Sequence, residues 1–218
     1  MALTKVRGSG LGTLGDGTAS DTAIVFDGNA QDFHIGLDDS ADSLTIGLGS
    51  TLGTTSHMVI DANGHITKPL QSAFSAECGT THTNISTGST TIQMDTERFD
   101  QNGDFNTSNY TFTAPVTGKY QFSWAVQFAD IGGESASGTS YMVTILDTSN
   151  IDYENAYFDF AIGDKTADST TLNGSALADM DANDTAVLKI YNNMGSTSGD
   201  IAGDSSQMTT YLTGYLVC

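Results

Sequence analysis

The segment DMDANDT, residues 179–185, concentrates side chains that could bind a metal ion. Asp and Asn oxygens at nearly alternating positions are the ligands that calcium loops use. An EF-hand loop also needs a glycine at its sixth position and a bidentate Glu at its twelfth, where this segment has Asp184 and Ile190. We therefore expect a hairpin turn here, with calcium binding as the alternative. The acidic segments at 38–42 and 99–104 are interpreted in the same way. No other cofactor is predicted, and an unchanged melting temperature with EDTA would remove the calcium hypothesis.

Side chains for catalysis are sparse. The four histidines are His34, His57, His65 and His82, and no His-Glu-x-x-His, Gly-x-Ser-x-Gly or Cys/His pattern accompanies them. With 26 Asp and Glu residues some carboxylates must lie close together, so a carboxylate pair that cleaves glycans is a minor alternative. We predict no catalytic residue and no enzymatic activity.

The charge balance also excludes one class of partner. The chain has a formal net charge of −19, with 26 acidic residues against 7 dispersed Lys and Arg. A surface that follows a phosphate backbone needs clustered basic side chains, so nucleic acid is not an expected partner. Acidic surfaces of this kind keep proteins soluble.

An alternating aromatic run predicts the main core strand. Large residues occupy the even positions from 120 to 128, and small or polar ones occupy the odd positions. Period-two alternation places the large side chains on one buried face. Pro115 and Gly118 precede the run and predict a hairpin turn after a strand at 109–114. The predicted core residues are Phe112, Tyr120, Phe122, Trp124 and Phe128.

The rest of the chain predicts an all-β protein in two modules. Very short apolar strands separated by Gly and Asp turns fill residues 21–69, and such units gain stability by stacking or by association of chains. Longer strands follow in residues 70–218, which suits a sandwich or jelly roll. The expected strands of this second module are 72–78, 90–95, 109–114, 119–129, 140–147, 155–162, 170–178, 185–192 and 208–217.

Cellular location is inferred from what the sequence lacks. No apolar segment approaches the roughly 20 residues of a membrane span, and the opening residues lack the apolar centre of a signal peptide. We expect no membrane insertion and synthesis in a cytoplasm. Cys78 and Cys218 are then expected to be free thiols, with a disulfide as the alternative if the two positions meet in the fold.

The second module resembles the globular head shared by complement-type proteins and the tumour necrosis factor superfamily. The resemblance covers residues 71–218. It rests on Asn102-Gly103, Phe112 before Ala114-Pro115, Gly118-x-Tyr120-x-Phe122, and Gly214 before Tyr215-Leu216-Val217. LADMDANDTAVLKIYN resembles the penultimate hairpin of the family.

This resemblance implies a ten-stranded jelly roll that forms a homotrimer and has no enzymatic activity. In the family plan, the last strand belongs to the sheet that faces the threefold axis. The implied trimer contacts are Tyr211, Leu212, Tyr215 and Leu216, although the resemblance leaves open which alternate side chains face the axis.

Residues 9–67 resemble the repeats of structural and fibre proteins of tailed bacteriophages. Together the two resemblances imply a homotrimeric virion appendage. Residues 1–20 would dock onto other virion proteins, residues 21–69 would form a stalk, and residues 70–218 would form a head that binds a glycan or protein on the host surface. A capsid decoration protein that stabilises or coats the particle is the alternative, and a glycan-cleaving tail spike is a minor one.

Two polar segments of the head are the expected receptor-binding loops. They are DIGGESASGTS at 130–140 and NMGSTSGDIAGDSS at 193–206. Loops displayed by a rigid scaffold commonly carry binding function. The candidate residues are Gly132, Glu134, Ser137, Ser196, Ser198 and Asp200.

Overall fold

The computed structural model describes residues 14–131, 140–159, 168–193 and 199–218. These residues form strands and turns without a helix, which confirms the predicted all-β class. Within the same ranges, no helix is available to cross a membrane. The chain divides into two compact units, Met1–Gln71 and Ser72–Cys218. We call them the N-terminal sheet and the C-terminal sandwich.

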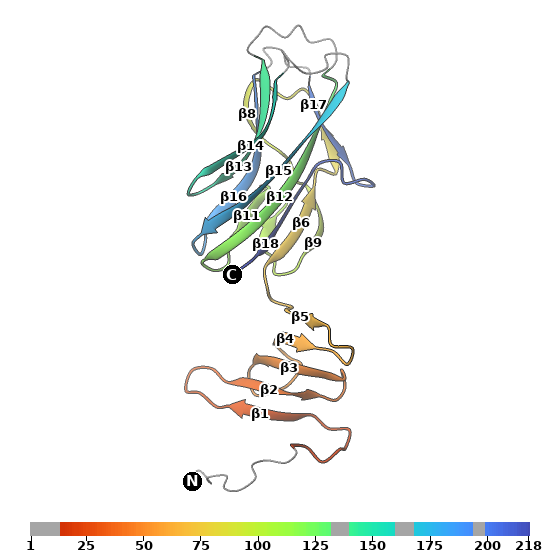
Figure 1. Cartoon of the computed structure of the whole chain (residues 1–218), viewed down its shortest axis with the longest axis vertical. Helices are drawn as coiled ribbons and strands as arrows, with labels where there is room; N and C mark the ends of the chain where they lie inside the picture. Colours follow the sequence, from red (N-terminus) through yellow and green to blue (C-terminus); the bar gives the residue numbers. More distant parts are fainter. Residues whose placement is uncertain (1–13, 132–139, 160–167, 194–198) are drawn as a thin grey trace. The chain divides into compact units, whose positions relative to one another are not determined.

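The N-terminal sheet is an antiparallel meander in which each strand pairs with the next one along the chain (Figure 1). The turns that join its strands are rich in Gly, Asp and Asn, which accept the backbone conformations of tight turns. The strands are β1 (Thr22–Phe26), β2 (Phe33–Asp38), β3 (Ser43–Leu48), β4 (Ser56–Ile60) and β5 (Ile66–Thr67).

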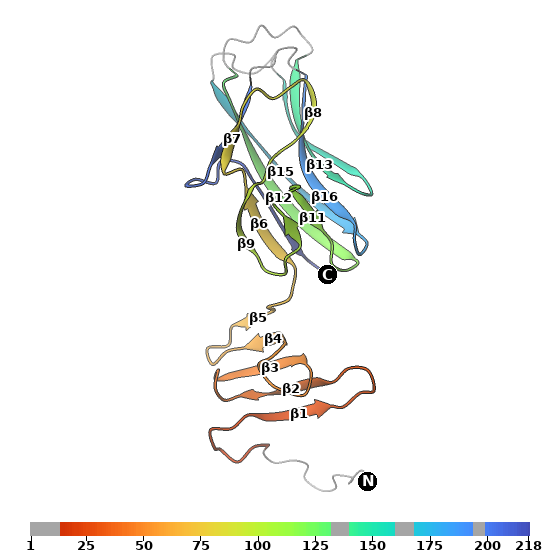
Figure 2. The same cartoon turned by 180° about the vertical axis from the view of Figure 1, so that it is seen from behind.

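The C-terminal sandwich consists of two sheets packed face to face (Figures 1 and 2). A six-stranded sheet contains β8 (Gly88–Thr91), β10 (Phe105–Asn106), β11 (Thr111–Thr113), β13 (Tyr141–Thr148), β14 (Asp152–Asp159) and β16 (Thr185–Asn192). A seven-stranded sheet contains β6 (Ala73–Glu77), β7 (Thr80–His82), β9 (Thr96–Asp100), β12 (Gly118–Ala129), β15 (Ser169–Met180), β17 (Asp200–Asp204) and β18 (Tyr211–Leu216).

Two predicted hairpins are instead crossings between the sheets. The turn at Pro115–Gly118 joins β11 to β12, and the turn after Met180 joins β15 to β16, yet in both cases the two strands belong to different sheets. The two turns lie together, because Asn183 donates its backbone N–H to the carbonyl of Ala114 at 2.8 Å. Turn chemistry shows where a strand ends, but it does not specify the sheet that receives the next strand.

The core of the sandwich lies between the sheets. All five predicted core residues, Phe112, Tyr120, Phe122, Trp124 and Phe128, are buried. Trp124 of β12 donates its indole N–H to the hydroxyl of Thr144 on β13 at 2.9 Å, and Thr144 donates in turn to the carbonyl of Asn155 at 2.6 Å. The largest side chain of the core is therefore held by packing and by a hydrogen bond across the two sheets.

Both cysteines are free thiols, Cys78 buried and Cys218 exposed. Burial and then the charge of Asp95 raise the pKa of the Cys78 thiol to about 11. A thiol reacts as its thiolate, so Cys78 stays unreactive at pH 8.

We expect a thiol-specific colorimetric reagent at pH 8 to modify Cys218 rapidly in the native protein and Cys78 only after unfolding. Cys218→Ser is the matched control and should abolish the rapid reaction. Equal rapid reaction of both thiols in the native protein would contradict the burial of Cys78.

Candidate functional site

One face of the N-terminal sheet is apolar and uncovered. Residues paired across antiparallel strands share a face, and the register aligns apolar residues in three rows across the sheet. The rows are Phe26, Phe33 and Leu48; Ile24, Ile35, Ile46 and Met58; and Leu37, Leu44, Ile60 and Ile66. At the paired positions of this face in the described sheet there is no Asp, Glu, Lys or Arg. Exposure reaches 59% for Phe26 and 58% for Ile66. We call these residues the apolar face.

The opposite face of the same sheet carries small and polar side chains that are buried on its central strands. His34, Asp38 and Thr45 belong to it, and each is less than a tenth exposed. The segment 49–55 covers them: His34 Nδ1 lies 2.9 Å from the carbonyl oxygen of Gly49, and Leu48 donates its backbone N–H to the carbonyl of Thr55 at 2.9 Å. The sheet therefore buries its polar face and exposes its apolar one, the reverse of an ordinary half-buried sheet. A contiguous exposed apolar surface of this kind marks an interaction surface.

The last strand divides the four predicted trimer contacts into two pairs. Leu212 is fully buried and Leu216 packs against the core, so both belong to the interior of the sandwich. The expectation that they form trimer contacts is corrected accordingly. Tyr211 and Tyr215 alternate with them and face outward, and Tyr215 is 53% exposed.

The outer face around these tyrosines is broad and poor in charge. Tyr215 pairs with Gln121 and Ala73, and Gln121 pairs with Leu177, which is 55% exposed. The next row along the sheet consists of Phe99, Ser75, Thr213, Ser123 and Ser175. We call these two rows, together with Tyr211, the sandwich assembly face.

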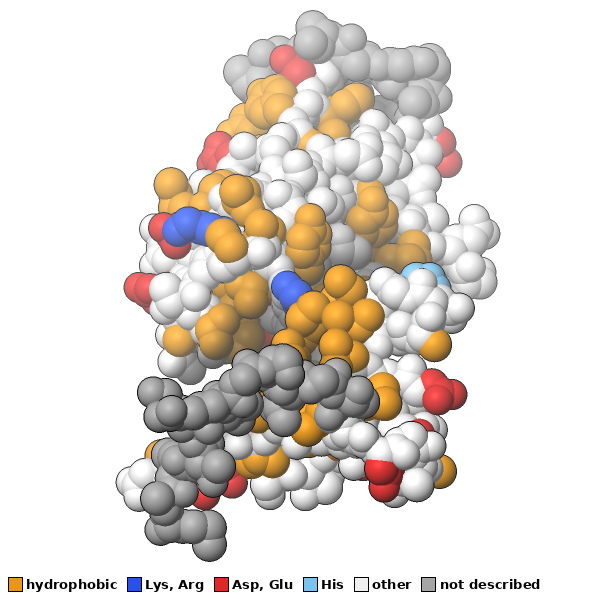
Figure 3. All heavy atoms as spheres, turned by 60° about the horizontal axis from the view of Figure 1, so that its bottom comes forward, with side chains coloured by type: hydrophobic (Ala, Val, Ile, Leu, Met, Phe, Trp, Pro, Cys, Tyr) orange, Lys and Arg blue, Asp and Glu red, His pale blue; other side chains and the backbone are white. Residues whose placement is uncertain are grey.

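Two ion pairs lie at the margins of this sheet. Glu77 is fully buried, and its Oε1 lies 2.6 Å from an Arg98 nitrogen. Lys119 pairs with Asp179 at the other end of β12. On the face of the molecule in Figure 3, exposed hydrophobic side chains gather in patches, whereas the Lys and Arg side chains lie apart from one another. Small polar and aromatic groups without net charge suit contact between identical chains.

The predicted receptor-binding loops are only partly described. Gly132, Glu134, Ser137, Ser196 and Ser198 lie outside the described residues. Asp200 belongs to strand β17 and pairs with Ala129, so the prediction of an uninterrupted loop at 193–206 is wrong. Its carboxylate accepts the backbone N–H of Asn84 at 2.8 Å. Gly and Asp around residues 200–204 favour a loop locally, but pairing with β12 and β7 overrides that preference.

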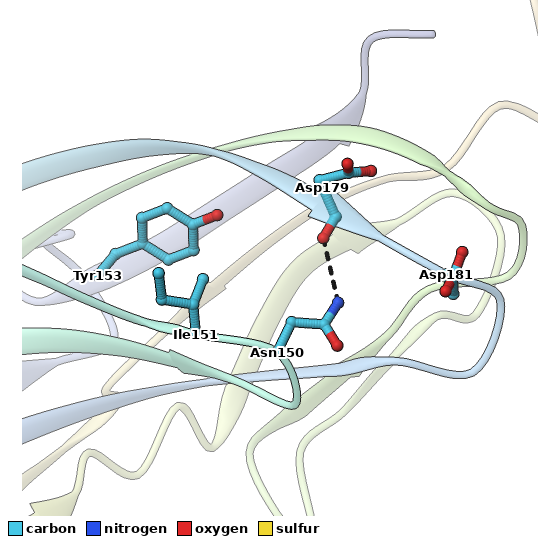
Figure 4. A pocket seen from close by; sticks show the side chains of 5 residues that line it. All are labelled: Asn150, Ile151, Tyr153, Asp179 and Asp181. Atoms are coloured by element: carbon cyan, nitrogen blue, oxygen red, sulfur yellow. Dashed lines mark hydrogen bonds between the residues drawn. The ribbon is translucent and has the colours of Figure 1, made fainter.

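The acidic segment at 179–185 forms one wall of a hollow at the end of the sandwich, lined by Asn150, Ile151, Tyr153, Asp179 and Asp181. Figure 4 shows Asn150 reaching to the backbone carbonyl of Asp179, a hydrogen bond of 3.2 Å. Asp184 accepts from the Asn150 amide at 2.6 Å and from the backbone N–H of Asp181 at 2.7 Å. These hydrogen bonds lower the pKa of Asp184, with the bond from Asp181 contributing most.

The carboxylates of this segment thus serve as internal acceptors. Among the described residues, no group of three or more His, Cys, Asp or Glu side chains is arranged to hold a metal ion. The hydrogen bonds of Asp184 instead tie the turn between β15 and β16 to the turn between β13 and β14.

Sequence reasoning missed two features of these surfaces. The alternation in residues 22–48 was visible, but the covering of its polar face by segment 49–55 depends on a tertiary contact. A cluster of three tyrosines, Tyr141, Tyr157 and Tyr191, was also missed, because these residues come from three strands whose register the sequence does not specify.

A profile of the C1q domain matches residues 73–217. The chain belongs to the C1q domain family. Domains of this family share a jelly-roll fold with the tumour necrosis factor family, typically form trimers, and bind ligands without catalysing reactions.

Among solved structures, the chain is similar to the globular domain of a zebrafish complement 1qA protein, with 16% identity and a TM-score of 0.47 over 68% of this chain and 98% of that one. It is also similar to murine APRIL, with 10% identity and a TM-score of 0.46 over 67% and 99% of the two chains. A third similar structure is the Eiger TNF of S. frugiperda, with 7% identity and a TM-score of 0.46 over 68% and 92%. Among curated proteins, none matches the chain.

Proposed function

We propose that this protein is a homotrimeric, non-enzymatic appendage of a bacteriophage virion, a fibre or spike whose C-terminal sandwich binds the host surface. The proposal divides the chain at the positions expected from the sequence. Residues 1–20 dock onto other virion proteins, residues 21–69 form the stalk, and residues 70–218 form the binding head. The protein is assembled in the host cytoplasm and needs no cofactor for this role.

The apolar face of the N-terminal sheet is the observation that carries the proposal. Ile35 and Ile46 stand at the middle of three apolar rows that the other described residues of the N-terminal unit leave uncovered. Burying an apolar side chain is worth roughly 1.5 to 3 kcal/mol when burial is complete, so leaving the rows in water is costly. Three copies that turn these faces inward would form a closed stalk with an apolar interior.

Threefold symmetry is favoured over other arrangements by the second unit. C1q domains typically form trimers, and the sandwich assembly face offers Tyr211, Tyr215 and Leu177 for contact between copies. Two surfaces on one chain, each suited to self-association, are satisfied together only if both follow the same symmetry. A trimeric head on a trimeric stalk meets this condition.

Host binding is tested by adsorption of purified, fluorescently labelled protein to a panel of bacterial strains. We expect binding to a subset of strains, with a large loss when residues 132–139 and 194–198 are replaced by Gly-Ser linkers of equal length. The trimer mass should be unchanged. Deletion of residues 1–20 is the matched control, because it should prevent incorporation into particles while leaving cell binding intact.

The alternative role as a decoration protein predicts the opposite pattern. In that case the labelled trimer binds no strain, and particles that lack it melt at a lower temperature. That result would contradict host attachment while leaving the trimeric architecture intact.

A further inference from the structure

Three tyrosines gather on the outer face of the six-stranded sheet. Strands β14 and β16 lie on either side of β13, and Tyr157 of β14 and Tyr191 of β16 are both aligned with Val143 of β13. The three side chains therefore share one face of the sheet. Tyr141 stacks against both, with ring centroids 4.9 Å from Tyr157 and 5.9 Å from Tyr191. The interplanar angles are 22° and 26°. The arrangement brings together aromatic side chains from three neighbouring strands.

These rings form the walls of a hollow of about 430 Å³. It is lined by Tyr141, Val143, Ile145, Glu154, Tyr157 and Tyr191. Val143 and Ile145 are 7% and 8% exposed and form an aliphatic floor, whereas Tyr157 is 59% exposed at the rim. Glu154 pairs with Ile145 and places one carboxylate beside the floor. A concave site with apolar walls and a few polar groups is the usual form of a small-ligand site.

We propose that this hollow binds one pyranose ring of a neutral glycan. The ring of a hexose has an apolar face of C–H groups and a rim of hydroxyls, and the hollow offers complementary groups. The tyrosine rings and the aliphatic floor pack against the C–H face. The Glu154 carboxylate accepts hydrogen bonds from hydroxyls, and the tyrosine hydroxyls donate or accept them.

The charges around the hollow select against acidic sugars and phosphates. Asp159 lies opposite Tyr141 on the neighbouring strand, and the Glu154 carboxylate lines the hollow, so the charged groups nearest to the ligand are acidic. Lys189 lies opposite Ile145 on the neighbouring strand, but its ammonium group forms an ion pair with Asp147. The hydrogen bond from Lys189 lowers the pKa of the Asp147 carboxyl. Desolvation, and then Asp159 and Tyr141, raise the pKa of Tyr157, so its phenol stays protonated. A carboxylate or phosphate ligand would meet like charge here, whereas a neutral ring would not.

Two of the three tyrosines are close in the sequence to segments assigned above to host recognition. Tyr141 follows residues 132–139, and Tyr191 precedes residues 194–198. The inference rests on the proposed function and deepens it, because it names neutral glycans as the class of host-surface ligand and the tyrosine hollow as their binding site.

The test uses saturation-transfer difference NMR on the full-length chain, with the methyl glycosides of glucose, galactose, mannose and N-acetylglucosamine as probes. At least one of them should receive saturation, and Tyr157→Ala and Tyr191→Ala should each weaken its affinity by about tenfold. Tyr157→Phe should retain most of the affinity, because it keeps the ring. Val116→Ala removes an exposed apolar group elsewhere on the sandwich and should change nothing. Methyl glucuronide should receive no saturation.

Three results would overturn the inference. The first is that no neutral glycoside binds, whether or not an oligoproline peptide binds at the tyrosines. The second is that a neutral glycoside binds equally well to folded Tyr157→Ala and Tyr191→Ala, and the third is that methyl glucuronide binds in preference. Failure here is distinct from failure of the proposed function. A trimer that adsorbs to cells with unchanged affinity after Tyr157→Ala keeps the function and loses this site.

Discussion

Replacing Ile46 by aspartate is expected to destabilise the trimer and leave the fold of each chain intact. Ile46 lies in the middle row of the apolar face, paired with Ile35 and Met58. In a single chain the new carboxylate would be exposed to solvent, since Ile46 is 38% exposed. In the trimer three carboxylates would enter one apolar interior, at a cost of about 2 kcal/mol or more each.

The measurement is the protein concentration at which the trimer half-dissociates, followed by light scattering on dilution. Three costs of about 2 kcal/mol raise the dissociation constant of the trimer by roughly 10,000-fold. This constant has units of concentration squared, so the midpoint concentration rises by about 100-fold. Val25→Asp is the matched control, because Val25 pairs with His34 on the opposite face of the same sheet. It should move the midpoint by a few-fold at most. Equal midpoints for the two variants would show that the apolar face is not an interface.

Replacing Trp124 by alanine is expected to lower the stability of the C-terminal sandwich by about 3 to 5 kcal/mol, the range for removal of a buried large aromatic side chain. Trp124 is almost fully buried, and its loss also leaves the Thr144 hydroxyl without its donor. The cavity and the unsatisfied Thr144 hydroxyl both lower the free energy of unfolding. The free energy of unfolding in urea, monitored by circular dichroism, measures the effect.

Gly174 gives an independent check on the same packing. A Cβ at this position would lie 2.3 Å from a Trp124 ring carbon, so Gly174→Ala forces the rigid indole or the strand to move. The Trp124→Ala variant lacks the obstructing ring, so adding Gly174→Ala to it should lower the free energy of unfolding much less than Gly174→Ala does in the native sequence. Val116→Ala should leave stability nearly unchanged. Additive effects of the two core substitutions would contradict the assigned contact.

Much of the sandwich was predictable because its signals are local. The alternation at 120–128 predicts strand, buried face and core residues together, since side chains alternate strictly along a strand. The chain segments at 115–118 and 181–184 were recognised as turns for the same reason. Their role as crossings between sheets was not, because strand pairing is decided by partners distant in sequence.

The surfaces were harder to predict than the core. On β18, alternation separates Tyr211 and Tyr215 from Leu212 and Leu216, but only the packed second sheet decides which pair is interior. For the N-terminal sheet, the sequence predicts short apolar strands that gain stability by stacking or by association of chains, but it does not show which side of the sheet the chain itself covers or that the apolar side is left exposed. The cover supplied by segment 49–55 lies on the other side, which cannot be deduced from periodicity.

The central claim is that two self-associating surfaces assemble this chain into a trimer. The most direct measurement is the light-scattering mass of the purified full-length chain, before and after heating. We predict a mass three times the chain mass of 22.8 kDa that persists until the sandwich melts. A stable monomer of 22.8 kDa would contradict both the stalk and the assembly face.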